Sequence, residues 1–122
     1  MNISSGDIVD RLSIIKLKLE RSDDKPNKEY EAFKRAFEEI KSKYPKFNWD
    51  FFLDIAYKAN GVVWDLESDI RTAQLDHDLV ETGKRAILIR KVNGIRVGIR
   101  NLINSVVGDG YIEIKHKDHI SR

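Results

Sequence analysis

Residues 78–108 read DLVETGKRAILIRKVNGIRVGIRNLINSVVG, and this segment sets the fold class of the chain. Its apolar residues recur at steps of four, three, four, three and four, which is the spacing of one helical face. They are Leu88, Val92, Ile95, Ile99, Leu102 and Val106. Asp78, followed three residues later by Glu81, resembles a helix-opening capping box, and Gly108 suits a C-cap. The segment therefore predicts one long helix.

A second long helix is predicted just before it. Asn48 suits the N-cap, and an apolar face continues for about six turns, which gives a helix of about 27 residues. That face comprises Phe52, Ile55, Ala59, Val62, Leu66, Ile70 and Ala73. Only a short loop, Leu75 to Asp78, follows. The two helices should therefore form an antiparallel hairpin.

Two further helices are predicted in the first 45 residues. One starts at Ser4 or Ser5 and the other spans Lys28 to Tyr44, with a linker containing Pro26 between them. The first has the apolar stripe Ile8, Leu12, Ile15 and Leu19, with Ile14 and Leu17 outside it. The second has the aromatic seam Tyr30, Phe33, Phe37, Ile40 and Tyr44. Four helices share one interior, so this surplus apolar surface predicts self-association.

Composition bounds the remaining possibilities. The chain has 122 residues, 41% of them hydrophobic and 34% charged, which suits a single domain over residues 1–122. It has no cysteine and no leader-like or membrane-spanning apolar run, so we expect a cytoplasmic protein that does not enter a membrane. A formal net charge of +2 argues against a surface devoted to nucleic acid. Tyr111 to Lys115 alternate in polarity and predict an extended C-terminal tail.

Charges are segregated across the predicted hairpin. The acidic side carries Asp50, Asp54, Asp65, Glu67, Asp69, Asp76 and Asp78, and the basic side carries Lys84, Arg85, Arg90, Lys91, Arg96 and Arg100. If the turn is centred near His77, residues of the two helices that are about equally far from His77 along the chain face each other. This register predicts three ion pairs, namely Asp69 with Arg85, Asp65 with Arg90, and Asp54 with Arg100.

A polar stripe on the last helix is the first candidate binding site. Asn93, Arg96, Arg100 and Asn104 are three or four residues apart and so share one face. Guanidinium groups bind phosphate or carboxylate oxygens in pairs, and carboxamides add uncharged donors. The stripe therefore suits an anionic small molecule such as a nucleotide or sugar phosphate. The alternative is a polar seam that faces a partner or another subunit.

Carboxylates give a second candidate. Asp65 and Asp69 are one helical turn apart, and Glu38, Glu39 and Glu81 are further acids that could join them at a Mg²⁺ site. The glutamate spacing of all-α nucleotide pyrophosphohydrolases is not met, because Glu38-Glu39 is followed by Ile40, Lys41 and Ser42. We therefore expect no resident metal and no enzyme activity.

The glycines of the last helix and the three histidines are not expected to carry chemistry. Gly83, Gly94 and Gly98 lie on a further face of the last helix, where they would permit close packing of another helix or form a ligand floor. His77, His116 and His119 lie in the predicted loop and tail, and we expect them to be solvated.

Three blocks of the chain resemble a small bacterial and phage domain family of unknown function. They are Ser5 to Arg21, Val63 to Arg71 (read as Trp-Asp-Leu-Glu-Ser-Asp-Ile-Arg from Trp64), and the set Asn93, Arg96, Asn104 and Gly108 with Glu113 and Lys115 beyond. The resemblance implies an all-α domain and supplies no catalytic residues. It draws attention to the polar residues inside the blocks, which are Asp7, Asp10, Trp64, Asp65, Asp69, Arg71, Asn93 and Arg96. With Arg85 and Arg90, they could form a polar network between the first, third and fourth helices.

The sequence as a whole predicts an all-α, four-helix up-and-down bundle with a long hairpin of its last two helices. We expect it to be a non-enzymatic binding or assembly module that needs no cofactor and forms homo-oligomers. An anion-binding site on the Asn/Arg stripe and a Mg²⁺-dependent nucleotide hydrolase are the alternatives.

Overall fold

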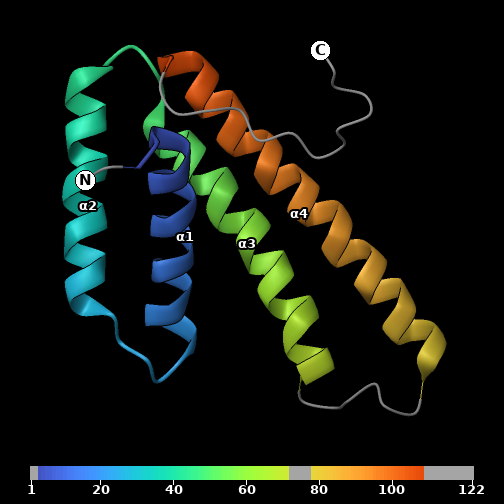
Figure 1. The fold of residues 1–122 in the computed structure, drawn as a ribbon. Helices are drawn as coiled ribbons and strands as arrows, with labels where there is room; N and C mark the ends of the chain where they lie inside the picture. The colour runs from blue at the N-terminus through green and yellow to red at the C-terminus, as the bar shows by residue number, and fades with distance from the viewer. Residues whose placement is uncertain (1–2, 72–77, 109–122) are drawn as a thin grey trace.

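The computed structural model describes residues 3–71 and 78–108, and these form four α-helices (Figure 1). The helices are α1 (Ser5–Arg21), α2 (Asn27–Lys43), α3 (Trp49–Arg71) and α4 (Leu79–Val107). The all-α four-helix bundle is thus confirmed, although α3 as described has 23 residues rather than 27. Ala73, the loop around His77, and the tail with His116 and His119 lie outside the described residues.

The helix ends follow the predicted capping residues. The Ser4 hydroxyl accepts a hydrogen bond from the backbone N–H of Asp7 at 3.2 Å, and the Asn48 carboxamide oxygen accepts one from Phe51 at 3.1 Å. The Asp78 carboxylate accepts one from the N–H of Glu81 at 2.9 Å. Gly108 ends α4 with a φ of 75°, a left-handed conformation that glycine adopts without strain.

Helix α1 is the centre of the bundle, because it packs against α2, α3 and α4. Ile8, Leu12 and Ile15 are buried as expected, and Leu17, which lies outside the predicted stripe, is buried as well. The aromatic seam of α2 packs into the same core, with Phe37 buried. The surplus apolar surface predicted on the first two helices is therefore used inside the chain, so that reason for self-association was wrong.

The apolar faces predicted on α3 and α4 are rotated relative to the faces that are buried. On α3 the most buried side chains are Trp49, Ala56, Asn60 and Val63, whereas Val62 is 46% exposed. On α4 the inward residues include Val97, Ile103 and Asn104. Leu88, Ile95 and Leu102, which belong to the predicted apolar face, are 47%, 57% and 51% exposed.

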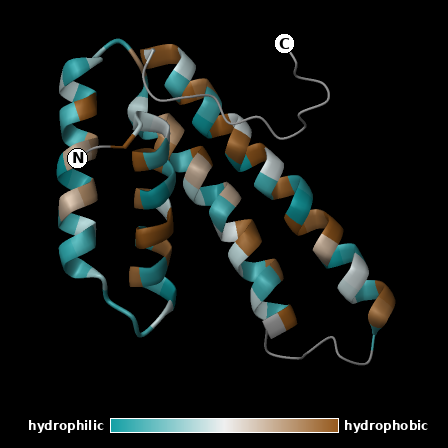
Figure 2. Ribbon diagram, in the orientation of Figure 1, coloured by the Kyte–Doolittle hydropathy of each residue, from teal (hydrophilic) through white to brown (hydrophobic). Residues whose placement is uncertain are grey.

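Figure 2 shows apolar residues recurring along the whole of α4, down to its N-terminal end. That end and the end of α3 extend beyond α1 and α2 (Figure 1), so neither of the first two helices covers them. Leu79 and Val80, at the start of α4, are strongly exposed.

Candidate functional site

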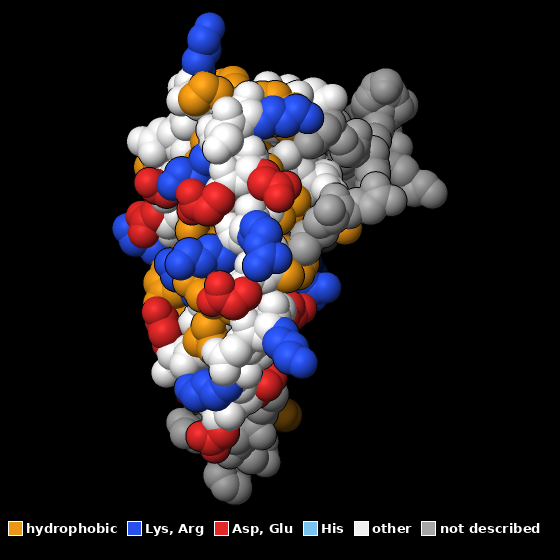
Figure 3. Space-filling view, turned by 90° about the vertical axis from the view of Figure 1, so that its left-hand side faces the viewer, with side chains coloured by type: hydrophobic (Ala, Val, Ile, Leu, Met, Phe, Trp, Pro, Cys, Tyr) orange, Lys and Arg blue, Asp and Glu red, His pale blue; other side chains and the backbone are white. Residues whose placement is uncertain are grey.

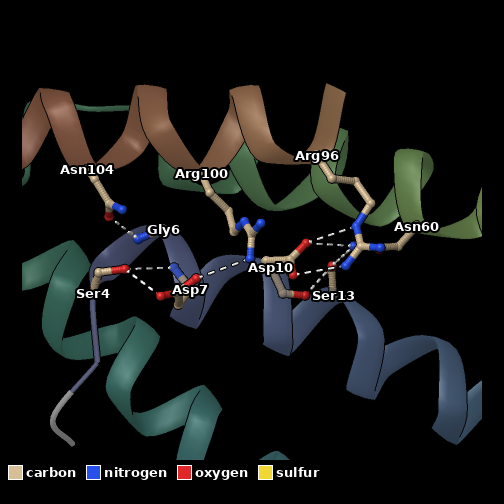
Figure 4. Close-up of polar contacts among 9 residues, drawn as sticks. All are labelled: Ser4, Gly6, Asp7, Asp10, Ser13, Asn60, Arg96, Arg100 and Asn104. Atoms are coloured by element: carbon tan, nitrogen blue, oxygen red, sulfur yellow. Dashed lines mark hydrogen bonds and ion pairs between the residues drawn. The ribbon is translucent and has the colours of Figure 1, made fainter. Parts of the chain in front are cut away.

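The Asn/Arg stripe of α4 faces α1, and Figure 4 shows the side chains of Arg96, Arg100 and Asn104 pointing at that helix. We call the resulting set of hydrogen-bonded residues the polar seam. It consists of Ser4, Gly6, Asp7, Asp10 and Ser13 of α1 and its cap, Asn60 of α3, and Asn93, Arg96, Arg100 and Asn104 of α4.

The centre of the polar seam is the ion pair between Arg96 and Asp10. The guanidinium donates from Nη2 to one carboxylate oxygen at 3.1 Å and from Nε to the other at 3.4 Å, which is a two-point contact (Figure 4). The Arg96 and Asp10 side chains are only 22% and 12% exposed. A third bond runs from Nη1 of Arg96 to the Asn93 carboxamide oxygen at 2.8 Å. Both groups are thus held in place by several partners.

Two buried residues of the polar seam, Asn60 and Ser13, were not predicted. The Asn60 carboxamide nitrogen donates to the Asp10 carboxylate at 3.1 Å and to the Ser13 hydroxyl at 2.7 Å. The Ser13 hydroxyl in turn donates to the backbone carbonyl of Asp10 at 2.6 Å. Asparagine and serine are poor helix formers, so their presence inside helices with apolar neighbours was the available signal.

At Gly6, near the N-terminus of α1, the backbones of α1 and α4 come close together. The N–H of Gly6 donates to the Asn104 carboxamide oxygen at 2.8 Å. A Cβ at this position would lie 2.5 Å from the backbone oxygen of Arg100, closer than non-bonded atoms can approach. Nearby, Arg100 contacts the Asp7 carboxylate at 3.5 Å. Only glycine allows α1 and α4 to approach this closely without a shift of the backbone.

The arginines of the predicted anion site therefore form ion pairs with carboxylates of this chain. Asp7 and Asp10 supply one negative charge each to Arg100 and Arg96. The alternative interpretation, a polar network that includes the first, third and fourth helices, is the one that these contacts favour.

The other residues of the predicted network lie elsewhere. Asp65 pairs with Arg21 of α1 at 2.7 Å, and Asp69 pairs with Arg85 at 2.5 Å. Trp64 is half-buried on α3 and Arg90 is exposed on α4, while the side chain of Arg71 lies outside the described residues.

The predicted hairpin register holds for one of its three ion pairs. Asp69 and Arg85 meet as expected. Asp65 with Arg90 and Asp54 with Arg100 were wrong, because α1 supplies nearer partners to Asp65 and Arg100. Asp54 pairs within its own helix with Lys58 at 3.0 Å. Charges of α1, which the register of the hairpin does not include, decide both pairings.

The carboxylates considered for Mg²⁺ do not gather. Within residues 3–71 and 78–108, no group of three or more His, Asp or Glu side chains is placed to hold a metal ion. Asp65 is largely exposed and paired with an arginine. Glu38 and Glu39 lie on α2, whose face in Figure 3 carries interspersed acidic and basic side chains.

A polar cleft of about 390 Å³ lies between α1 and α3, lined by Lys16, Glu20, Asp50, Leu53, Asp54 and Tyr57. The Tyr57 hydroxyl donates to the Glu20 carboxylate across it. This hydrogen bond raises the pKa of Tyr57 above its ordinary value, because the ionised phenolate would face a carboxylate. The ammonium group of Lys16 lies 5.7 Å from the centre of the same ring.

Exposed apolar side chains lie on the side of α4 that faces away from α1, and we call this surface the outer face. It consists of the exposed residues Ile87, Leu88, Ile95 and Leu102. Leu88, Ile95 and Leu102 are seven residues apart and form one line about 21 Å long. Gly83, Gly94 and Gly98, expected to pack closely, have no atom within 4 Å of the position that a Cβ would take. The expectation of close packing at these glycines within the chain was wrong.

Among the described helices, none is long and apolar enough to cross a membrane. Comparisons of the chain with protein-family models, with characterised proteins and with solved structures found no match. The resemblance carried by the three sequence blocks therefore stays a prediction.

Proposed function

We propose that this chain is a non-enzymatic protein-binding module and that the outer face of α4 is its binding surface. The observation that carries the proposal is the exposure of Leu88, Ile95 and Leu102, which are 47%, 57% and 51% exposed although they repeat every seven residues, as one of the two rows of a coiled-coil seam does. A seam of this kind buries its residues only when another helix packs on it.

The contacts within the chain support this assignment. The opposite side of α4 is already bound to α1 through Arg96, Arg100 and Asn104, so α4 cannot rotate its apolar line inward without breaking those contacts. Large exposed apolar surfaces on folded domains mark interaction sites. The groups that would serve an anion or a metal ion are instead engaged by other residues of the chain.

Native mass spectrometry of the full chain tests the proposal. We expect the unsubstituted chain to carry a bound protein subunit and Ile95→Glu to lose it, with the helical circular dichroism signal retained because Ile95 is outside the core. Arg35→Gln, which changes an exposed residue of α2 by the same single charge, is the matched control and should keep the subunit. A chain that is monomeric with and without Ile95→Glu would overturn the proposal.

A further inference from the structure

We propose that the subunit bound to the outer face is a second copy of this chain, with the two α4 helices crossing antiparallel about a two-fold axis at Ile95. This inference rests on the proposed function and names its partner.

The spacing of the outer face is self-complementary in this arrangement. Leu88 and Leu102 are each seven residues from Ile95, on opposite sides of it. In an antiparallel pair centred there, Leu88 of each copy is level with Leu102 of the other, and Ile95 meets Ile95. All three positions of the line are then buried by the same three positions of the second copy, as a two-fold interface requires.

The charges of α4 favour antiparallel over parallel packing. From Thr82 to Gly108 the helix carries no acid, and its exposed basic residues, Lys84, Arg90 and Lys91, all precede Ile95. Parallel packing would place these like charges side by side. Antiparallel packing about Ile95 places Lys91 level with Ile99 of the second copy and Lys84 level with Val106. The half with the exposed basic residues then meets a half whose two arginines already pair with Asp7 and Asp10.

The two glycines beside Ile95 allow a close approach. Gly94 and Gly98 are one turn apart and face open space in this chain. Gly98 precedes Leu102 by one turn along the same side of α4, so the backbone of a second helix could lie against it without a side chain in between.

Cysteine cross-linking tests the arrangement directly, since the chain has no cysteine of its own. Ile95→Cys should link to itself through a short thiol-reactive cross-linker, because the residue lies on the two-fold axis. Leu88→Cys should not link to itself, and neither should Leu102→Cys, because in the antiparallel pair the same residue of the two copies is about 21 Å apart along the helix axis. An equimolar mixture of these two variants should link. Arg35→Cys on α2 is the control and should not link to itself.

The outcomes separate the two proposals. Self-linking of Leu88→Cys would show parallel packing and overturn the antiparallel arrangement. A different protein held at the outer face and lost in Ile95→Glu would overturn this inference while the proposed function stands. A monomer whose Ile95→Cys thiol labels at the rate of Arg35→Cys would overturn both. A monomer with that thiol protected would mean that residues 109–122 cover the face, which would also overturn both.

Discussion

Gly6 fixes the distance between α1 and α4. A Cβ there would lie 2.5 Å from the Arg100 carbonyl oxygen and 2.8 Å from the Asn104 carboxamide oxygen. We expect Gly6→Ala to lower the free energy of unfolding by about 1–3 kcal/mol, because overpacking outweighs the better helix propensity of alanine. Urea denaturation measures it. Gly83→Ala, in open space on α4, is the control and should be neutral or stabilising by up to about 1 kcal/mol.

Asp10 and Arg96 depend on each other. Asp10→Asn keeps the shape of the side chain but removes the charge that faces a mostly buried guanidinium, so we expect a loss of about 2 kcal/mol in unfolding free energy. The double variant Asp10→Asn, Arg96→Met should lose less than the sum of the single variants. Purely additive losses would show that the two side chains do not interact. If the stripe instead bound anions, phosphate would raise the melting temperature more than chloride at equal ionic strength.

The Tyr57 hydroxyl offers a spectroscopic test of the contact between α1 and α3. Its pKa is raised chiefly by the hydrogen bond to Glu20, so this bond stabilises the fold below the ordinary tyrosine pKa and is lost as the pH rises through the raised value. Glu20→Gln should therefore lower the pKa of Tyr57, as followed by the ultraviolet absorbance of tyrosinate. The part of the absorbance titration that disappears in Tyr57→Phe is the part that Tyr57 contributes. An unchanged titration in Glu20→Gln would contradict the contact.

At the residue scale, capping residues could be predicted and long-range partners could not. Ser4, Asn48 and Asp78 act on backbone groups within a few positions, so their local sequence was sufficient. The partner of Asp10 is 86 positions away. No local pattern specifies which of several arginines such a carboxylate meets.

At the scale of helices, the hairpin register can be tested at Asp69 and Arg85. Asp69→Lys and Arg85→Glu should each destabilise the chain, and the exchange of both should recover part of the loss. Both side chains are partly exposed, so we expect a coupling of about 0.5–1 kcal/mol in a chemical denaturation cycle. The recovery should be incomplete, because Arg85 also binds Glu81. Strict additivity would contradict this register in solution.

Helix boundaries and apolar lines were also predictable, whereas their orientation was not. The heptad line of α4 exists, but the pairing of Arg96 and Arg100 with Asp10 and Asp7 leaves its residues Leu88, Ile95 and Leu102 exposed, while Ile99 packs on the core. On α3 the predicted apolar face included Val62, which is exposed, and did not include Asn60, which is buried. Periodicity finds a face of a helix, and only the neighbouring helices decide where that face points.

At the scale of the whole molecule, self-association makes stability depend on concentration. If two copies join through the outer face, the melting temperature of the unsubstituted chain should rise with protein concentration. Ile95→Glu should melt at a temperature that does not vary with concentration and that approaches the value of the dilute unsubstituted chain. Calorimetry over a hundredfold range of concentration checks both. A concentration-independent melting temperature for the unsubstituted chain would contradict assembly.

The four-helix arrangement itself followed from the length, spacing and caps of the apolar segments. The central place of α1 could be suspected from Ile14 and Leu17, which lie outside its main stripe, and Leu17 is indeed buried. What could not be predicted was that α1 would also pair its carboxylates with α4, since that depends on the packing of segments from opposite ends of the chain.

The bond between Gly6 and Asn104 joins residues 98 positions apart, and this has a consequence for synthesis on the ribosome. At roughly 5–20 residues per second, Asn104 is added about 5–20 s after Gly6. During that interval α1 can pack only against α2 and α3, and Asp7 and Asp10 have no arginine of α4 to pair with. The N-terminal part of the chain therefore exists first as an incomplete bundle, and closure of the bundle is set by the arrival of its last helix.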